Sequence, residues 1–153
     1  MTELALQRLK AAGWTSGRKA DISQIEEAYA EAGMQIPDKL REFFEEFGFL
    51  RLTFDIRHTE PERHTPDTRR LFLNYPNAAS LADLFADYGI FGTAYPVGFA
   101  FRGNMELFFH DDGNFYLYMP CCQLVRERKS GADLVAALCG DEAAKSAWER
   151  LAY

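Results

Sequence analysis

The sequence has few cysteines, few basic residues in its middle and no long apolar run. The cysteines are Cys121, Cys122 and Cys139, and an odd number with one adjacent pair is a poor disulfide framework. Because no Cys-x-x-Cys spacing occurs, no zinc site or redox-active dithiol is indicated, and we expect reduced thiols in the cytoplasm. No apolar run reaches the roughly 20 residues that span a bilayer. Residues 1–14 lack the basic and apolar regions of a secretory signal, so we do not expect them to be one.

Basic residues are scarce between residues 71 and 125, where Arg102 stands alone beside five acidic residues. The formal net charge of the whole chain is −6. Because phosphate backbones bind to basic surfaces, we expect no nucleic-acid partner. The same acidic field favours a basic protein partner, because opposite charges speed and stabilise the encounter.

Hydrophobic residues make up 48% of the 153 residues, which is ample for one core, and we expect a single domain over residues 1–153. The periodicity of the sequence changes within "FFEEFGFL", residues 43–50. Apolar residues recur at helical spacing up to Phe47, Gly48 ends this pattern, and alternation with a period of two begins at Leu50. We therefore predict a helix, a glycine stop and a strand.

The same signals predict the other elements. Helices are predicted over residues 3–12, 21–33 and 37–48, from Ser80 to Gly89, from Ser130 onward and from Asp141 onward. Strands are predicted over residues 50–56, 70–75 and 122–128, with a polar loop at 57–69. This order predicts an α+β fold, in which helices pack on a largely antiparallel central sheet.

Residues 96–119 predict a three-stranded meander. A three-residue turn at 111–113, with Gly113 in the left-handed region, places Phe109 opposite Phe115. A similar turn at 102–104 places Phe99 opposite Leu107. The first face then carries Val97, Phe99, Phe101, Met105, Leu107, Phe109, Phe115, Leu117 and Met119. The second face carries Gly98, Ala100, Glu106, Phe108, His110, Asn114, Tyr116 and Tyr118.

Two clusters of reactive side chains were considered, one as a metal site and one as a catalytic nucleophile. His58 and His64 lie in the polar loop among acidic residues, but their spacing matches no helix or hairpin geometry for a metal ion. Cys121 and Cys122 lack a positioned base and a recognisable nucleophile signature, so we interpret them as structural thiols.

Three other patterns are explained by local structure. The segment 111–113 lacks the ligand spacing of a calcium loop, and turn chemistry accounts for it. The glycines after residue 88 belong to no phosphate-binding motif. The glutamates of the third predicted helix lie on its solvent-facing side, which argues against a paired-carboxylate site. The residues concerned are Gly89, Gly92, Gly98, Glu42, Glu45 and Glu46. We therefore predict no catalytic, cofactor-binding or metal-binding residue.

The second face of the meander combines aromatic and acidic side chains, which suit a protein-binding surface. An equally open interpretation is that a helix covers this face and the tyrosines belong to the core. The candidate partner-binding residues are Glu106, Phe108, Asp111, Asp112, Tyr116 and Tyr118.

Several segments, taken in order, resemble the SUKH superfamily, and most closely its third subgroup of bacterial immunity proteins. They are Gly13-Trp14 followed by Arg18, then "IPDKLREFFEEFGFL", "YPVG" at residues 95–98 and "DDGNFY" at residues 111–116. The family pattern often has Phe-Gly-Gly-Leu where this chain has Phe47-Gly48-Phe49-Leu50, which is a departure within a turn.

The resemblance implies a SUKH-like α+β fold with no cofactor and no catalysis. It also implies a cytoplasmic protein that binds and neutralises a toxin, often a nuclease, delivered between competing bacteria. On this expectation the acidic middle of the chain meets a basic toxin surface, with Phe108 and the tyrosines as anchors.

Three alternatives stay open at this point. The first is a regulatory or scaffold module of the same superfamily, which would bind other proteins without neutralising a toxin. The second is a small-molecule or peptide-binding domain with a pocket over Gly98 and Ala100. The third is a thiol hydrolase acting through Cys121 or Cys122, which would need a lowered thiol pKa.

Overall fold

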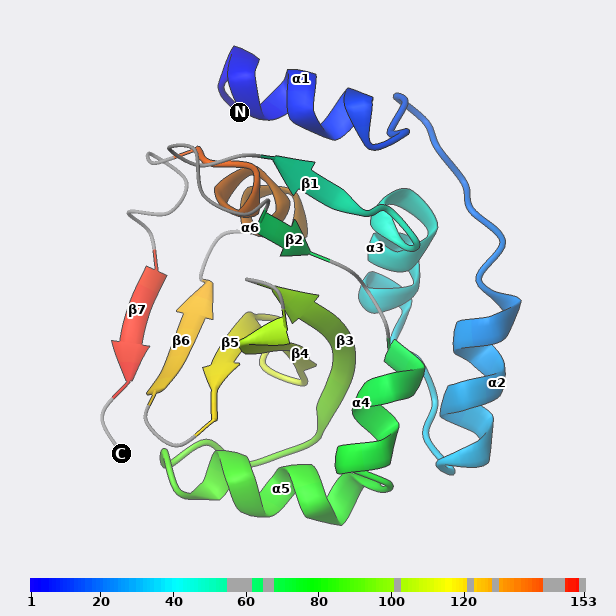
Figure 1. Cartoon of the computed structure of the whole chain (residues 1–153). Coiled ribbons are helices and arrows are strands. Elements are labelled where there is room, and N and C mark those ends of the chain that lie inside the picture. The colour runs from blue at the N-terminus through cyan, green and yellow to red at the C-terminus, as the bar shows by residue number, and fades with distance from the viewer. Residues whose placement is uncertain are drawn as a thin grey trace.

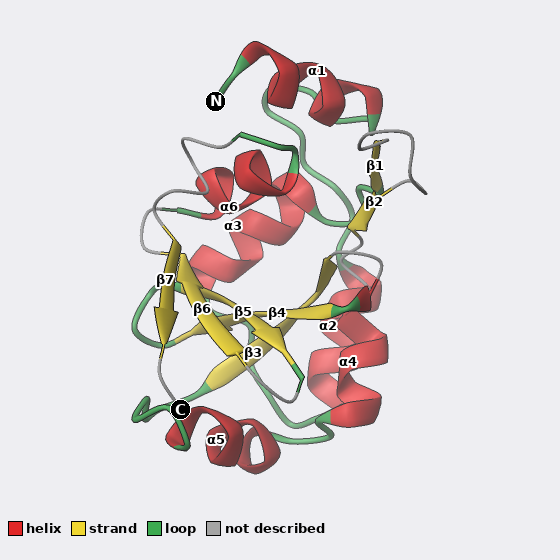
Figure 2. Ribbon diagram, turned by 60° about the vertical axis from the view of Figure 1, so that its left-hand side comes forward, coloured by secondary structure: helices red, strands yellow, loops and turns green. Residues whose placement is uncertain are grey.

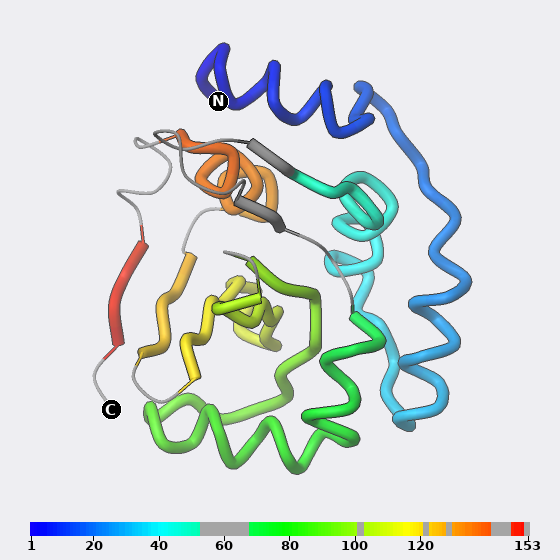
Figure 3. Tube along the Cα trace, viewed as in Figure 1, coloured from blue at the N-terminus to red at the C-terminus, as the bar shows by residue number. Residues whose placement is uncertain are grey.

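The computed structural model describes residues 1–54, 62–64, 68–100, 103–120, 123–127, 130–141 and 148–151. The helices are α1 (Glu3–Ala11), α2 (Ser23–Glu31), α3 (Asp38–Phe47), α4 (Thr68–Asn74), α5 (Ala78–Ala86) and α6 (Gly131–Leu138). The strands are β1 (Leu52–Phe54), β2 (Glu62–His64), β3 (Ala94–Ala100), β4 (Met105–His110), β5 (Phe115–Met119), β6 (Gln123–Glu127) and β7 (Trp148–Leu151). The chain passes through α1 to α5 before it enters the main sheet at β3 (Figure 3).

The main sheet contains five strands in the order β3-β4-β5-β6-β7, and β1 and β2 form a separate two-stranded ribbon. Every neighbouring pair of strands in the main sheet is antiparallel. Helices α3 and α6 lie on one side of this sheet and α5 lies on the other (Figure 2). The predicted α+β fold with an antiparallel central sheet is therefore confirmed.

The two faces of the sheet belong to two separate hydrophobic clusters. The first-face core joins the sheet to α1, α2, α3 and α6, and includes Phe44 and Phe115. The second-face core joins the sheet to α4 and α5, and its rings of Phe85 and Phe108 lie 5.8 Å apart, edge to face. Because each fully buried large apolar side chain contributes about 1.5–3 kcal/mol, both layers of helices are held to the sheet by burial. Figure 1 shows α5 along one end of the sheet and α4 beside β3.

The predicted helix, glycine stop and strand around residue 48 are present. Phe44 is fully buried on α3, and a Cβ at position 48 would lie 2.3 Å from the carbonyl oxygen of Phe44, so only glycine fits there. Arg18 donates from Nη1 to the carbonyl of Glu46 at 2.7 Å and from Nη2 to that of Gly48 at 2.8 Å. These bonds satisfy backbone carbonyls at the end of α3.

Two helices begin at a different residue from the one predicted. Helix α2 starts at Ser23, whose backbone N–H donates to Asp21 Oδ1 at 3.0 Å, so Asp21 does not form a capping box with Gln24. Helix α5 starts at Ala78, and its N-cap is Asn77 rather than Ser80. At α5 the amide of Asn77 takes the capping role, whereas the N-cap of α2 is Ile22, which makes no side-chain cap bond.

Two predicted elements are of the wrong type, and part of the predicted loop is ordered. Residues 70–75 fall mostly in helix α4, not in a strand, and residues 148–151 form strand β7, not a helix. Both segments are too short for periodicity to decide, so packing against the rest of the chain determines their type. The predicted loop at 57–69 contains β2 and the start of α4.

The predicted register between β3 and β4 is wrong by one residue. The register shifts between Pro96 and Gly98, so that Gly98 lies opposite Leu107 and Phe99 lies opposite Glu106. This β-bulge at Val97 inserts an extra residue and reverses the side on which every later side chain of β3 lies. Phe99 therefore belongs to the second-face core, and Ala100 belongs to the first-face core.

Candidate functional site

The turn between β4 and β5 presents two adjacent carboxylates at the surface. Phe109 lies opposite Phe115, and Gly113 has a φ of +83°, so the predicted three-residue turn is confirmed. Asp111 and Asp112 are both exposed. Lys39 of α3 donates to the carbonyl of Gly113 at 2.9 Å and ties the turn to the helix layer. We call Asp111, Asp112 and Gly113 the acidic turn.

Asp111 connects the acidic turn to the chain segment that leads into β3. Its Oδ2 accepts from the backbone N–H of Thr93 at 3.0 Å, and its own N–H donates to the carbonyl of Thr93 at 3.0 Å. Its Oδ1 accepts from the hydroxyl of Tyr95 at 2.8 Å. Burial and this hydrogen bond raise the pKa of Tyr95 to about 12, so the hydroxyl stays protonated and remains a donor to Asp111 at neutral pH.

Asp112 is held by bonds within the hairpin. Its side chain accepts from the backbone N–H of Asn114 at 2.9 Å and from the hydroxyl of Tyr116. Partial burial raises the pKa of the Asp112 carboxyl, but these hydrogen bonds outweigh it and lower the pKa below its usual value. The carboxylate is therefore charged at neutral pH and fixed in position. Arg126 supports it from behind by donating to the Tyr116 hydroxyl at 2.9 Å.

His110 lies directly beneath this surface. Its side chain is almost fully buried, and its ring stacks on Phe85 with centroids 5.5 Å apart. The backbone N–H of Asp112 donates to His110 Nδ1 at 3.1 Å, which places the proton of the neutral ring on Nε2. Within the part of the chain that the structure describes, Nε2 has no hydrogen-bond partner. A buried donor without a partner costs about 1–3 kcal/mol.

Helices α4 and α5 cover the second face of the meander. This decides between the two interpretations of that face. Phe108 and Tyr116 are fully buried, and Glu106 is 6% exposed. Glu106 accepts from the hydroxyl of Tyr75 at 2.6 Å, beside the second-face core. The covered-face interpretation is therefore confirmed, and the aromatic rings are core residues.

Of the six candidate partner-binding residues, three lie at buried positions: Glu106, Phe108 and Tyr116. Asp111 and Asp112 are exposed and Tyr118 is partly exposed. A role of these residues in binding stays a prediction, now centred on the acidic turn.

The other sequence candidates give no catalytic arrangement among the described residues. No group of three or more His, Cys, Asp or Glu there could hold a metal ion. Burial raises the pKa of the Cys139 thiol to about 11, which makes it a poor nucleophile. His58, Cys121 and Cys122 lie outside the described residues. On α3, Glu42 is exposed and the other two glutamates are partly exposed, as expected for the solvent-facing side of the helix.

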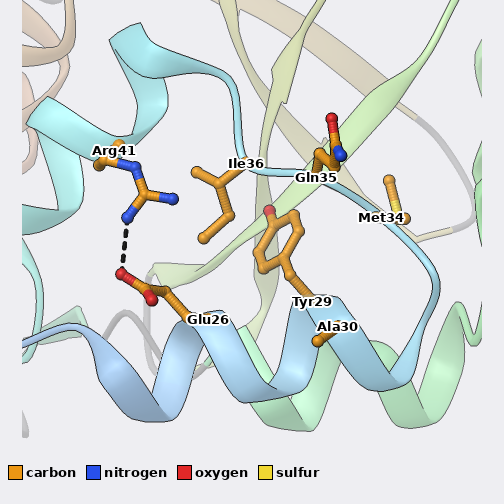
Figure 4. Close-up of a pocket in the computed structure, with 7 residues that line it drawn as sticks. All are labelled: Glu26, Tyr29, Ala30, Met34, Gln35, Ile36 and Arg41. Carbon is orange, nitrogen blue, oxygen red and sulfur yellow. Dashed lines mark hydrogen bonds and ion pairs between the residues drawn. The ribbon is translucent and has the colours of Figure 1, made fainter.

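A shallow groove of ≈ 330 Å³ runs along α2, far in the sequence from the predicted pocket. Gly98 and Ala100, over which the sequence placed that pocket, are both buried in β3. Glu26 and Arg41 form an ion pair at 2.6 Å across one end of the groove (Figure 4). The groove is lined by Glu26, Tyr29, Ala30, Met34, Gln35, Ile36 and Arg41. Its charged groups satisfy each other, so it offers little to orient a small ligand.

One exposed aromatic residue beside the acidic turn was not predicted from the sequence. Phe91 is 78% exposed and lies in the segment between α5 and β3. A signal for it does exist in the sequence, because Phe91 is a large apolar residue between Gly89 and Gly92, outside any periodic pattern.

These features define an α+β protein with a pre-organised acidic turn on its surface. The model of the SUKH-3 immunity protein family matches residues 1–140, and the chain belongs to that family. This confirms the resemblance described from the sequence motifs, and the family is generally non-catalytic. No curated protein and no solved structure matches the chain. None of the described helices has the length and hydropathy needed to cross a membrane.

Proposed function

We propose that this protein is a cytoplasmic immunity protein that binds a cognate secreted bacterial toxin and neutralises it without catalysis of its own. The observation that carries the proposal is the match of the SUKH-3 immunity protein family to residues 1–140. The toxin is a nuclease-type effector delivered in contact-dependent competition, and the immunity protein occludes its active surface in the cell that produces it.

The acidic turn supports a basic toxin surface as the partner. Asp111 and Asp112 each accept a bond from a backbone N–H, so their carboxylates are in place before a partner arrives. A nuclease binds phosphate through positively charged groups, and fixed carboxylates compete for the same groups. The same charges repel nucleic acid and anionic lipid, so we expect neither as a partner.

The acidic turn alone is too small to be the whole interface. A specific complex buries roughly 1,600 Å² in total, half of it on each partner. The accessible surface of this protein is 8282 Å², so about a tenth of it would be covered. The contact must therefore extend well beyond the turn, and the partly exposed Tyr118 towards the other end of β5 is one candidate.

The proposal is tested with the C-terminal domain of any large secreted protein that is encoded beside this gene. We expect the full-length protein to form a tight complex with that domain, to abolish its toxicity and its nuclease activity, and to bind less tightly as salt concentration rises. Absence of a complex with this domain, or a complex that leaves it active, contradicts the proposal.

A pair of double variants tests the position of the interface. Asp111→Asn with Asp112→Asn removes both charges but keeps the side-chain carbonyl acceptors, and we expect at least a tenfold loss of affinity and a weaker salt dependence. The control is Glu27→Gln with Glu31→Gln, which removes the same number of negative charges from two exposed residues on α2 and should leave affinity within about twofold. Equal effects of the two pairs would indicate attraction by net charge alone.

A further inference from the structure

Phe91 is exposed in a segment that is otherwise firmly anchored. On one side of it, Ile90 is 8% exposed in the second-face core, and its backbone N–H donates to the carbonyl of Phe85 at 3.1 Å. On the other side, Thr93 exchanges two hydrogen bonds with Asp111. The backbone on both sides of Phe91 is therefore fixed, and its ring is held outward at 78% exposure.

The neighbouring Gly92 lies between the exposed surface and the buried His110. Gly92 is exposed, and a Cβ at this position would lie 3.1 Å from His110 Cε1, 3.4 Å from Nε2 and 3.7 Å from Asp111 Oδ2. The ring of His110, with its unpartnered Nε2 donor, therefore packs directly against Gly92. A protein that binds over Gly92 would lie above a buried donor that has no partner among the described residues, and such a donor needs an explanation.

The charged side chains nearest to Phe91 along the chain and across the bonds to Thr93 are acidic. Asp87, Asp111 and Asp112 are exposed carboxylates close to it in sequence or through the bonds to Thr93. Among the described residues of the segment 71–120 there is no lysine or arginine. The exposed Lys39 of α3 brings one positive charge to the far side of the turn, where it donates to the carbonyl of Gly113. An aromatic side chain surrounded by acidic groups suits an apolar pocket with a basic rim.

We propose that Phe91 is the apolar anchor of the toxin-binding surface, with Asp111 and Asp112 as its acidic rim. This inference rests on the proposed immunity function and names the part of the surface that carries most of the affinity. The toxin presents an apolar pocket edged by lysine or arginine side chains. Because the segment around Phe91 is fixed in advance, little conformational freedom is lost when the ring enters the pocket.

The test is the affinity of Phe91→Ala for the same toxin domain, measured by titration calorimetry on the full-length protein. We expect roughly a 30-fold loss of affinity, which is the size of effect of a central anchor. The melting temperature should stay within about 2 °C of wild type, because an exposed side chain contributes little to folding. The salt dependence should also be kept, since the acidic rim is intact.

Leu73→Ala is the matched control, because Leu73 on α4 is 81% exposed and equally apolar. It should bind like wild type. If the wild-type protein binds and neutralises the toxin but Phe91→Ala binds equally well, the anchor is disproved and the immunity function stands. A similar loss in both variants also disproves it, since apolar surface in general would then explain the affinity. If the wild-type protein does not bind, the immunity function and this inference both fail.

Discussion

Phe49 has a backbone conformation that is unfavourable for any residue with a Cβ. Its φ is +63°, in the left-handed region, directly after Gly48. Such a residue costs roughly 1–2 kcal/mol relative to glycine. The family pattern Phe-Gly-Gly-Leu has its second glycine at this position. The replacement of that glycine by Phe49 therefore introduces strain into the backbone.

The strain at Phe49 can be measured by comparing the stabilities of two substitutions, Phe49→Gly and Phe49→Ala, which both remove the phenyl ring. We expect Phe49→Gly to be more stable than Phe49→Ala by about 1 kcal/mol, because the relief of strain exceeds the entropy that glycine adds to the unfolded chain. Urea denaturation of both variants measures the difference. The control is Leu4 on α1, where Leu4→Gly should be less stable than Leu4→Ala by about 1 kcal/mol. The same order at both positions would contradict the strain.

Glu106 makes the stability of the protein depend on pH. Burial raises the pKa of this carboxyl above its ordinary value of 4.5, although bonds from Tyr75 and Asn74 act in the opposite direction. An acid with a raised pKa in the folded state stabilises the fold fully below its unfolded pKa, and this contribution is lost as the pH rises through the folded pKa.

Glu106→Gln keeps an acceptor for the Tyr75 hydroxyl but carries no charge. We therefore expect the variant to be more stable than wild type at pH 7, with a difference that disappears below pH 4.5, where the wild-type carboxyl is protonated in both states. Free energies of unfolding in urea between pH 4 and 8 test this. A constant difference over that range would show that packing, and not ionisation, causes it.

For the helices and strands, side chains form hydrogen bonds with the free backbone groups at helix ends and at the edge of the sheet. The carbonyls of Pro96 and Val97 on the β3 edge accept bonds from the hydroxyls of Tyr29 and Thr68, from α2 and α4. Pro96 also has no backbone N–H to offer a further strand. This edge of the sheet is therefore protected from pairing with another chain.

The cap of α5 offers a direct test at this scale. Asn77 Oδ1 accepts from the backbone N–H of Ser80 at 3.1 Å, whereas the Ser80 hydroxyl donates to the carbonyl of Asn77 at 2.7 Å. We expect Asn77→Ala to lower the free energy of unfolding by about 1 kcal/mol, because an orphan N–H of the helix loses its acceptor. Ser80→Ala should cost less, about 0.5 kcal/mol. The reverse order in urea denaturation would favour Ser80, as the sequence alone suggested.

At the scale of the whole molecule, the second-face core holds the α4–α5 layer on the sheet. Phe85 is fully buried there, and its ring contacts those of Phe108, His110 and Tyr116 at centroid distances of 5.8, 5.5 and 5.1 Å. The same ring stacks on His110 beneath the acidic turn. Phe85 therefore stabilises both the second-face core and the position of the acidic turn.

Removal of this ring should destabilise the whole protein. We expect Phe85→Ala to lower the free energy of unfolding by about 3–5 kcal/mol, because it leaves a cavity between helix and sheet. Leu73→Ala, on the exposed side of the neighbouring helix, should change it by less than about 0.5 kcal/mol. Calorimetric or urea unfolding separates the two, and a small effect of Phe85→Ala would mean that α5 is not essential to the core.

Features that depend on neighbouring residues could be predicted from the amino-acid sequence. The helix that ends at Gly48, the three-residue turn at Gly113 and the acidic middle of the chain could all be predicted, because periodicity, turn chemistry and charge are local signals. The ordered motifs also identified the family.

Features that depend on contacts between distant parts of the chain became visible with the folded structure. The bulge at Val97 moved Phe99 to the other face, and the α4–α5 layer buried Phe108 and Tyr116. The structure also left Phe91 exposed beside Asp111, although 20 positions separate them in the sequence. A side chain of a given type is equally suited to a core or to an interface, and which of the two it joins depends on whether another element covers it.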